Sequence, residues 1–184
     1  MEKVAVTVLG CDRPGIVCET SSLLAGMNCN IEDISQTVIQ DEFAGIFLVS
    51  IPRDLSLEKF DAALQQGLQP LELHCFVKKV RSRQGASAVP ASEPFVIITI
   101  GPDRIGLIAA LTTVMKKFQV NITNLRFVNG APSFPEKTVT IYEVAIPQNV
   151  HLAQFTVELQ AAAEKAGLEV NVQHKKIFEE ICRV

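Results

Sequence analysis

The chain contains an internal repeat, and this repeat restricts its fold more than any other feature of the sequence. The segment G-C-D-R-P-G-I-V at 10–17 aligns with G-P-D-R-I-G-L-I at 101–108, an offset of 91 residues. The same offset brings Asn-Ile at 30–31 onto Asn-Ile at 121–122. Because the offset persists through a strand pattern, a turn and a helix pattern, we expect two copies of one folding unit.

The copies differ in length, and the segment between them has its own composition. At 51–64 and 146–159 the offset has grown to 95, so the second copy has gained four residues. We place them in a loop at 129–136, where glycine and proline are frequent. The segment 81–94 (RSRQGASAVPASEP) favours an exposed linker, because it has almost no large apolar residues. The predicted organisation is a first domain 1–80, a linker 81–94 and a second domain 95–184.

Both copies predict the same order of elements, because period-two apolar patterns indicate strands and period-3.6 patterns indicate helices. In the first copy the expected strands are 3–9, 31–39, 43–51 and 71–77, and the helices 15–27 and 56–68. In the second copy the strands are 95–100, 122–128, 138–146 and 168–174, and the helices 105–118 and 152–166. The order βαββαβ builds a four-stranded antiparallel sheet with two helices on one face, a ferredoxin-like α+β fold. The tail 175–184 is predicted to form a short terminal helix.

Composition excludes several classes of function. A net charge of -3, from Lys+Arg 17 and Asp+Glu 20, lacks the basic surface that binds a phosphate backbone, so no direct contact with nucleic acid is expected. No apolar run approaches the ~18 residues of a membrane span, and no signal segment opens the chain, so we expect a cytoplasmic protein without membrane contact. The 5 cysteines and 3 histidines form no ligand motif, and therefore no metal or cofactor is predicted.

The residues that the copies share concentrate at the first strand-to-helix turn, D-R-P-G at 12–15 and D-R-I-G at 103–106. In a structural interpretation, Asp12 caps the helix, Pro14 occupies its first turn, and Gly15 lets it pack closely. In a functional interpretation, the glycines leave helix N-terminal N–H groups open to a small anion such as a carboxylate. On the turn alone, the structural interpretation is favoured.

Charge narrows the ligand class that the turn could accept. Asp12 would repel a phosphate but could pair with an ammonium group, so a zwitterion suits both ends of the site. Asn30, expected just before the second strand, and its counterpart in the second copy offer amides that both donate and accept. Asparagine is also common in such turns because it tolerates a left-handed backbone. We expect Arg13 and Arg104 to be solvated or paired with an acid, and Asp103 to cap its helix.

Two βαββαβ units with D-R-P-G or D-R-I-G after the first strand and Asn-Ile before the second resemble tandem ACT domains. The resemblance covers nearly the whole chain apart from the linker. A free-standing tandem pair is most similar to the glycine cleavage system transcriptional repressor group. This resemblance implies a non-enzymatic regulator that senses a small metabolite, an amino acid such as glycine or serine, bound between two ACT units. It further implies a homodimer with units paired side by side, and a protein partner such as a transcriptional regulator. Related tandem units also occur in phosphoserine phosphatases and formyltetrahydrofolate deformylases.

Carried over position by position, the resemblance implies a ligand site in each copy. The first site would contain Asp12, Arg13, Pro14, Gly15, Asn30 and Ile31. The second would contain Asp103, Arg104, Gly106, Asn121 and Ile122. Ile105 stands where the fuller pattern has proline, and residues 1–80 carry a net charge of -5 against +1 for 95–184. We therefore expect the first copy to bind ligand better and the second to serve in pairing or partner contact.

Two alternatives from other classes remain. Acylphosphatases are enzymes with the same fold, a loop arginine and a nearby asparagine, which Arg13 and Asn30 could imitate. A phosphate cradle needs free N–H donors and positive charge, and Asp12 and Pro14 supply neither. The other alternative is a ligand-free scaffold or dimerisation module, whose edge strands would pair because a βαββαβ sheet leaves them open.

Overall fold

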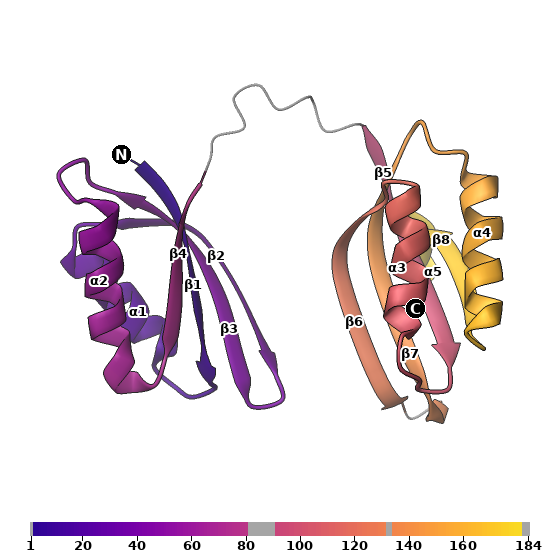
Figure 1. Cartoon of the computed structure of the whole chain (residues 1–184), viewed down its shortest axis with the longest axis horizontal. Coiled ribbons are helices and arrows are strands. Elements are labelled where there is room, and N and C mark those ends of the chain that lie inside the picture. The colour runs from indigo at the N-terminus through magenta and orange to yellow at the C-terminus, as the bar shows by residue number, and fades with distance from the viewer. Residues whose placement is uncertain (1, 81–90, 132–133, 182–184) are drawn as a thin grey trace. The chain divides into compact units, whose positions relative to one another are not determined.

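The computed structural model of the chain describes residues 2–80, 91–131 and 134–181. They belong to two compact units, Met1–Gly85 and Ala86–Val184. Each unit is a four-stranded antiparallel sheet with two helices packed on one face (Figure 1). The predicted ferredoxin-like α+β fold is therefore confirmed in both copies.

The first unit follows the order βαββαβ, with a sheet order of β2-β3-β1-β4. Its strands are β1 (Glu2–Cys11), β2 (Asn30–Ile39), β3 (Glu42–Ile51) and β4 (His74–Lys79). Its helices are α1 (Ile16–Gly26) and α2 (Leu57–Leu68), and a short 3-10 turn at Gln69–Leu71 follows α2. The strand that follows α1, β2, pairs antiparallel with β3, and the strand that follows α2, β4, pairs antiparallel with β1.

The second unit repeats this topology with the sheet order β6-β7-β5-β8. Its strands are β5 (Ser92–Gly101), β6 (Asn121–Ala131), β7 (Phe134–Pro147) and β8 (Glu169–His174). Its helices are α3 (Leu107–Lys117), α4 (Leu152–Lys165) and the terminal α5 (Lys175–Ile181), which fits the helix predicted for the tail. Among the described residues, no helix is both long and apolar enough to cross a membrane.

The repeat is visible in the two cores. Val4, Val6 and Val8 alternate along β1 and are fully buried, as expected of a strand with one face against helices. On α2, Phe60 and Leu64 are one turn apart and fully buried; Phe155 and Leu159 on α4 take the same places in the second core. Each such side chain contributes about 1.5–3 kcal/mol by burial, so the apolar spacing fixes which face of each helix meets the sheet.

Three segments differ from the sequence-based expectation. The strand predicted at 71–77 begins only at His74, because Gln69–Leu71 form a 3-10 turn and Glu72 has a left-handed backbone. β5 begins at Ser92, three residues earlier than expected and within the predicted linker 81–94, of which 81–90 lie outside the described residues. The loop predicted at 129–136 is wrong, because β6 and β7 run through it as a longer hairpin, with 132–133 outside the described residues. A register shift between Asn129 and Ala131 absorbs part of the added length without ending the ladder.

The outer strands β2 and β6 are long edges with little cover on either face. Ile34 and Val38 of β2 lie on the helix side of the sheet and are exposed, as are Leu125 and Phe127 of β6. Both strands carry a bulge near their start, after Ile31 and after Ile122. Long apolar edge strands are normally covered or paired in proteins, so these edges are candidate interaction surfaces.

Candidate functional site

The turn between β1 and α1 is built around a left-handed glycine. Gly15 is the N-cap of α1 with φ 105°, and no side chain caps this helix. The cap predicted for Asp12 is therefore wrong; its backbone N–H donates to the carbonyl of Asp41 at 2.7 Å. Pro14 precedes the N-cap instead of occupying the first helical turn. A side chain can cap a helix when its N-cap residue has an extended backbone. Here the N-cap is a glycine with a left-handed backbone, and no side chain caps the helix.

The second copy repeats this arrangement. Gly106 is the N-cap of α3 with φ 92°, and no side chain caps the helix, so the capping role expected of Asp103 is also wrong. A Cβ built at Gly15 or at Gly106 would meet no atom within 4 Å. Open space therefore lies beside both helix N-termini, where N–H groups and the helix dipole favour a carboxylate.

The side chain of each turn arginine extends to the turn before the last strand of its unit. Nη2 of Arg13 donates to the carbonyl of Leu71 at 3.2 Å, at the end of the 3-10 turn before β4. Arg104 reaches the matching turn of the second unit, where its Nη1 lies 3.5 Å from the position that a Cβ on Gly167 would occupy. Arg13 and Arg104 are exposed, as expected of solvated side chains. The contact of Arg13 with Leu71 was not expected, and it links the candidate loop to the turn before the last strand.

Asn30 and Asn121 lie at the start of an edge strand. Each is the first residue of its strand, β2 or β6, and neither has a left-handed backbone. The left-handed residues of these turns are Asn28, with φ 54°, and Gln119, with φ 56°. The structural explanation offered for the two asparagines is therefore wrong, and their side chains are exposed at the edge. Ile31 and Ile122, by contrast, pack against the two cores and leave chiefly their backbone for a ligand.

A groove runs between α3 and the edge strand β6 in the second unit. One cavity of ≈ 570 Å³ lies at its loop end and includes Asp103, Gly106 and Phe127. A second of ≈ 450 Å³ lies at the other end and includes Asn121 and Ile122. Thr112 lines both cavities, so they lie next to each other along α3, and together they are called the α3–β6 groove here. All five residues that the resemblance implies for this copy line one cavity or the other.

Thr112 was missed by sequence reasoning. It aligns with Ser21 at the repeat offset of 91, so a small hydroxyl residue recurs at this helix position. Its Oγ1 donates to the carbonyl of Ile108 at 2.8 Å and remains able to accept a hydrogen bond. Comparing the non-identical positions of the repeat would have found it.

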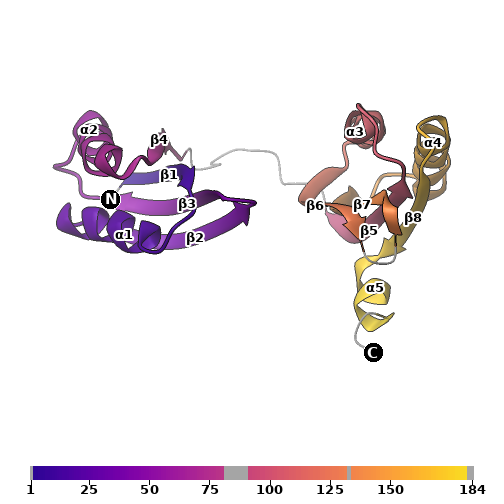
Figure 2. The ribbon, with the colours of Figure 1, turned by 90° about the horizontal axis from the view of Figure 1, so that it is seen from below.

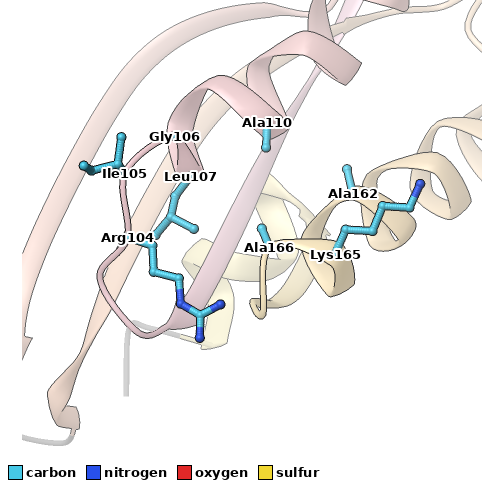
Figure 3. A pocket seen from close by; sticks show the side chains of 8 residues that line it. All are labelled: Arg104, Ile105, Gly106, Leu107, Ala110, Ala162, Lys165 and Ala166. Atoms are coloured by element: carbon cyan, nitrogen blue, oxygen red, sulfur yellow. The ribbon is translucent and has the colours of Figure 1, made fainter.

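A further cavity of ≈ 420 Å³ lies on the other side of α3, between α3 and α4 (Figure 3). Ala110 points into it from α3, and Ala162 and Ala166 from α4. The side chains of Arg104 and Lys165 flank it. In the first unit, a cavity of ≈ 290 Å³ lies at the end of α2, and none of the predicted site residues lines it.

Perturbed titratable groups lie away from the loop. Lys3 and Ser50 hold the pKa of Glu32 below its ordinary value, and Lys175 and Asn124 do the same for Glu143. Burial raises the pKa values of the Cys29 and Cys75 thiols and raises that of Tyr142 to about 12. Among the described residues, no group of three or more His, Cys, Asp or Glu could hold a metal ion.

Sequence comparison identifies the fold family. The ACT domain profile matches residues 2–78. A UPF0237 protein of Methanopyrus kandleri is 47% identical over 79 residues, which cover 42% of this chain and 88% of the relative. The chain belongs to the ACT-domain family. A UPF0237 protein of Methanosarcina acetivorans is 34% identical over 93 residues, or 50% of this chain and 98% of that one.

Solved structures extend the ACT fold to the whole chain. A protein of unknown function from Galdieria sulphuraria matches 94% of this chain and 98% of its own, with a TM-score of 0.75 and 24% identity. A proposed glycine cleavage system transcriptional repressor matches 94% and 96%, with a TM-score of 0.69 and 18% identity. Both likenesses concern the fold, and together with the repeat they make this a tandem ACT protein.

Proposed function

We propose that this tandem ACT protein is a non-enzymatic sensor of a free amino acid, such as glycine or serine, and signals its occupancy through a protein partner such as a transcriptional regulator. The observation that carries the proposal is the groove between α3 and β6, which joins an uncapped helix N-terminus to the carboxylate of Asp103. An amino acid presents one carboxylate and one ammonium group, and the groove offers a partner for each.

The binding mode follows from charge. The ligand carboxylate accepts hydrogen bonds from the first N–H groups of α3, which no side chain caps. The ligand ammonium pairs with Asp103, and the hydroxyl of Thr112 accepts a further hydrogen bond from it. Phe127 lines the apolar part of the same cavity, where a small side chain fits. Asn121 at the far end adds an amide to the site.

We assign the stronger site to the second unit, in contrast to the expectation drawn from Ile105. The side chain of Ile105 is fully exposed and leaves the α3 N-terminus open. The two cavities of the groove contain every site residue expected for this copy. The first unit then serves chiefly in pairing or partner contact.

Two observations support a binding role over catalysis. The guanidinium of Arg13 is engaged with the carbonyl of Leu71, so the arginine that an acylphosphatase would aim at phosphate serves as a brace here. The thiols of Cys29 and Cys75 have raised pKa values, which disfavours the nucleophilic thiolate. We therefore infer that the turn binds and releases its ligand unchanged.

The proposal is tested by calorimetric unfolding of the full chain with each of the twenty amino acids. A ligand at 100 times its Kd stabilises the folded protein by ~2.7 kcal/mol, a shift of about 5–11 °C in the unfolding temperature. The shift should disappear in Asp103→Asn and persist in Asp12→Asn, the matched change in the first copy. Equal loss in both variants would reject the assignment to the second unit.

A second candidate is a ligand-free scaffold, favoured by the exposed edges β2 and β6. In a scaffold these strands pair with ACT units of a second copy and the grooves stay empty. The same titration separates the two functions, because a scaffold shows no concentration-dependent shift with any amino acid.

A further inference from the structure

The two units differ on one face of the sheet. This is the face opposite α1 and α2 in the first unit, and opposite α3 and α4 in the second. In the second unit, α5 lies on this face, opposite α3 and α4 (Figure 2). Lys175 of α5 bonds to Glu143 of β7 at 2.6 Å, and Val96 of β5 is only 2% exposed although it points to this side. Among the described residues of the first unit, no helix lies on the corresponding face (Figure 2).

The uncovered face of the first sheet, here called the open face, carries large apolar side chains. Phe76 of β4 is 65% exposed, Ile46 of β3 is 54% and Leu9 of β1 is 47%. They surround Thr7 of β1, which pairs with Ile46 on one side and Phe76 on the other. A group of exposed large apolar side chains of this kind marks an interaction site in a folded protein.

The strand registers arrange the open face in three rows across β2-β3-β1-β4. The first row is Asp33, Leu48, Ala5 and Lys78. The second row is Ser35, Ile46, Thr7 and Phe76. The third row is Thr37, Ala44, Leu9 and His74. In every row the two central positions, on β3 and β1, pair one large apolar residue with a smaller one.

We propose that the open face is a homodimer interface, in which two copies of the first unit pack face to face about a two-fold axis parallel to their strands. This rotation keeps each row in place and reverses its order, so that β2 lies over β4 of the second copy and β3 over β1. Leu48 then meets the partner's Ala5, Ile46 the partner's Thr7, and Leu9 the partner's Ala44.

The same rotation matches charge. Asp33 and Lys78 stand at opposite ends of the first row, so each carboxylate lies over an ammonium of the other copy, twice per dimer. Phe76 falls on the partner's Ser35, which leaves room for the ring. A two-fold axis perpendicular to the strands would instead stack Ile46 on itself and Phe76 on itself. The pattern of sizes and charges therefore selects the parallel axis.

The dimensions suit such a contact. Three strands about 34 Å long and the six-residue β4, about 20 Å long, lie about 4.8 Å apart and present on the order of 590 Å² of flat sheet. This is about three quarters of the ~800 Å² per partner of a standard interface. Packed sheets lie ~10 Å apart, a gap that interdigitating large and small side chains fill. The proposed interface does not include the α3–β6 groove of the second unit. We therefore expect the dimer to form without a bound amino acid.

Analytical ultracentrifugation of the full chain without ligand tests the interface. Ile46→Lys should lower the mass of the assembly by a factor of two and raise the dimer dissociation constant at least tenfold. Val157→Lys, which changes a 64% exposed apolar residue of α4, should leave the mass unchanged. Circular dichroism confirms that both variants are folded. A monomeric wild type, or an assembly that Ile46→Lys does not alter, overturns the proposal.

A charge exchange tests the axis. Asp33→Lys and Lys78→Asp should each weaken the dimer, because each places like charges over one another, whereas the double variant should restore it. Lys59→Asp on α2 is the control and should change nothing. Contact through the β2 edge would respond to Asp33→Lys but would gain nothing from the added Lys78→Asp, so failure of the rescue rejects the face-to-face dimer. Amino-acid binding is measured in a separate experiment. A failure to bind any amino acid would contradict the proposed function but would not change the conclusion about the dimer.

Discussion

At the scale of single residues, close backbone approach explains the glycines that end the first strand of each unit. A Cβ at Gly101 would lie 2.6 Å from Cδ2 of Leu168 and 2.8 Å from the carbonyl oxygen of Gly167. Gly10 meets the matching Leu73 and Glu72 in the first unit. The last strand of each unit can therefore begin beside the candidate loop only where no side chain intervenes.

Replacing Gly101 by alanine should destabilise the protein. The added methyl collides with backbone that cannot move away, and we expect a loss of about 1–3 kcal/mol in the free energy of unfolding. Gly26→Ala is the matched control: nothing lies within 4 Å of its Cβ, and helix propensity predicts a gain of about 0.5–1 kcal/mol. Urea denaturation of both variants checks the signs; a neutral Gly101→Ala would contradict the close approach.

The structure changes the roles that the sequence suggested for residues of the turn. Gly15, Gly106, Asn30 and Asn121 were selected because the repeat retains them, and their part in ligand binding stays a prediction. The capping roles failed because a left-handed glycine at the N-cap cannot be distinguished, by pattern alone, from a glycine that follows a capping side chain. The brace from Arg13 to Leu71 joins residues 58 positions apart, a separation that no local pattern reveals.

At the scale of elements, α5 is held to its sheet by charge. Lys175 and Asn124 lower the pKa of Glu143 from its ordinary value of 4.5, so ionised Glu143 is favoured in the folded state. Because the folded pKa lies below the unfolded one, this stabilisation is complete above pH 4.5 and is lost as the pH falls through the folded pKa. Acid should therefore loosen α5 first.

Glu143→Gln tests this link. At pH 7 the variant should unfold at a lower temperature than the wild type, because glutamine cannot form the ion pair with Lys175. Below the folded pKa of Glu143 the two proteins should unfold at the same temperature, since the wild-type carboxyl is then protonated. Thermal unfolding followed by circular dichroism from pH 7 to pH 3 measures the difference; a gap that stays constant with pH would contradict the role given to this pair.

The order of helices and strands could be predicted from apolar periodicity, because each copy has enough buried alternation to set its elements. Element ends were less predictable. The β6–β7 hairpin continues through a segment rich in glycine and proline, because an edge strand tolerates proline and a bulge tolerates glycine. The position of α5 depends on tertiary contacts with β5 and β8, and only its helical character could be anticipated.

At the scale of the whole molecule, the two copies of the repeated unit differ in the surfaces that they expose. The second unit has a groove with acid, hydroxyl and apolar groups beside an open helix N-terminus, and its sheet is covered by α5. The first unit leaves its sheet uncovered and exposes an apolar face. We infer that ligand binding and self-association are divided between the copies. A division was expected from Ile105 and from the charge difference between the copies, but our proposal exchanges the two roles.

The central claim is that the second unit holds a free amino acid. It is tested most directly by equilibrium dialysis of the full chain against a mixture of the twenty amino acids, followed by chromatography of both compartments. We predict that one or two amino acids accumulate with the wild-type protein and with Asp12→Asn, and that this excess vanishes with Asp103→Asn. Equal concentrations of every amino acid on both sides of the membrane would contradict the account.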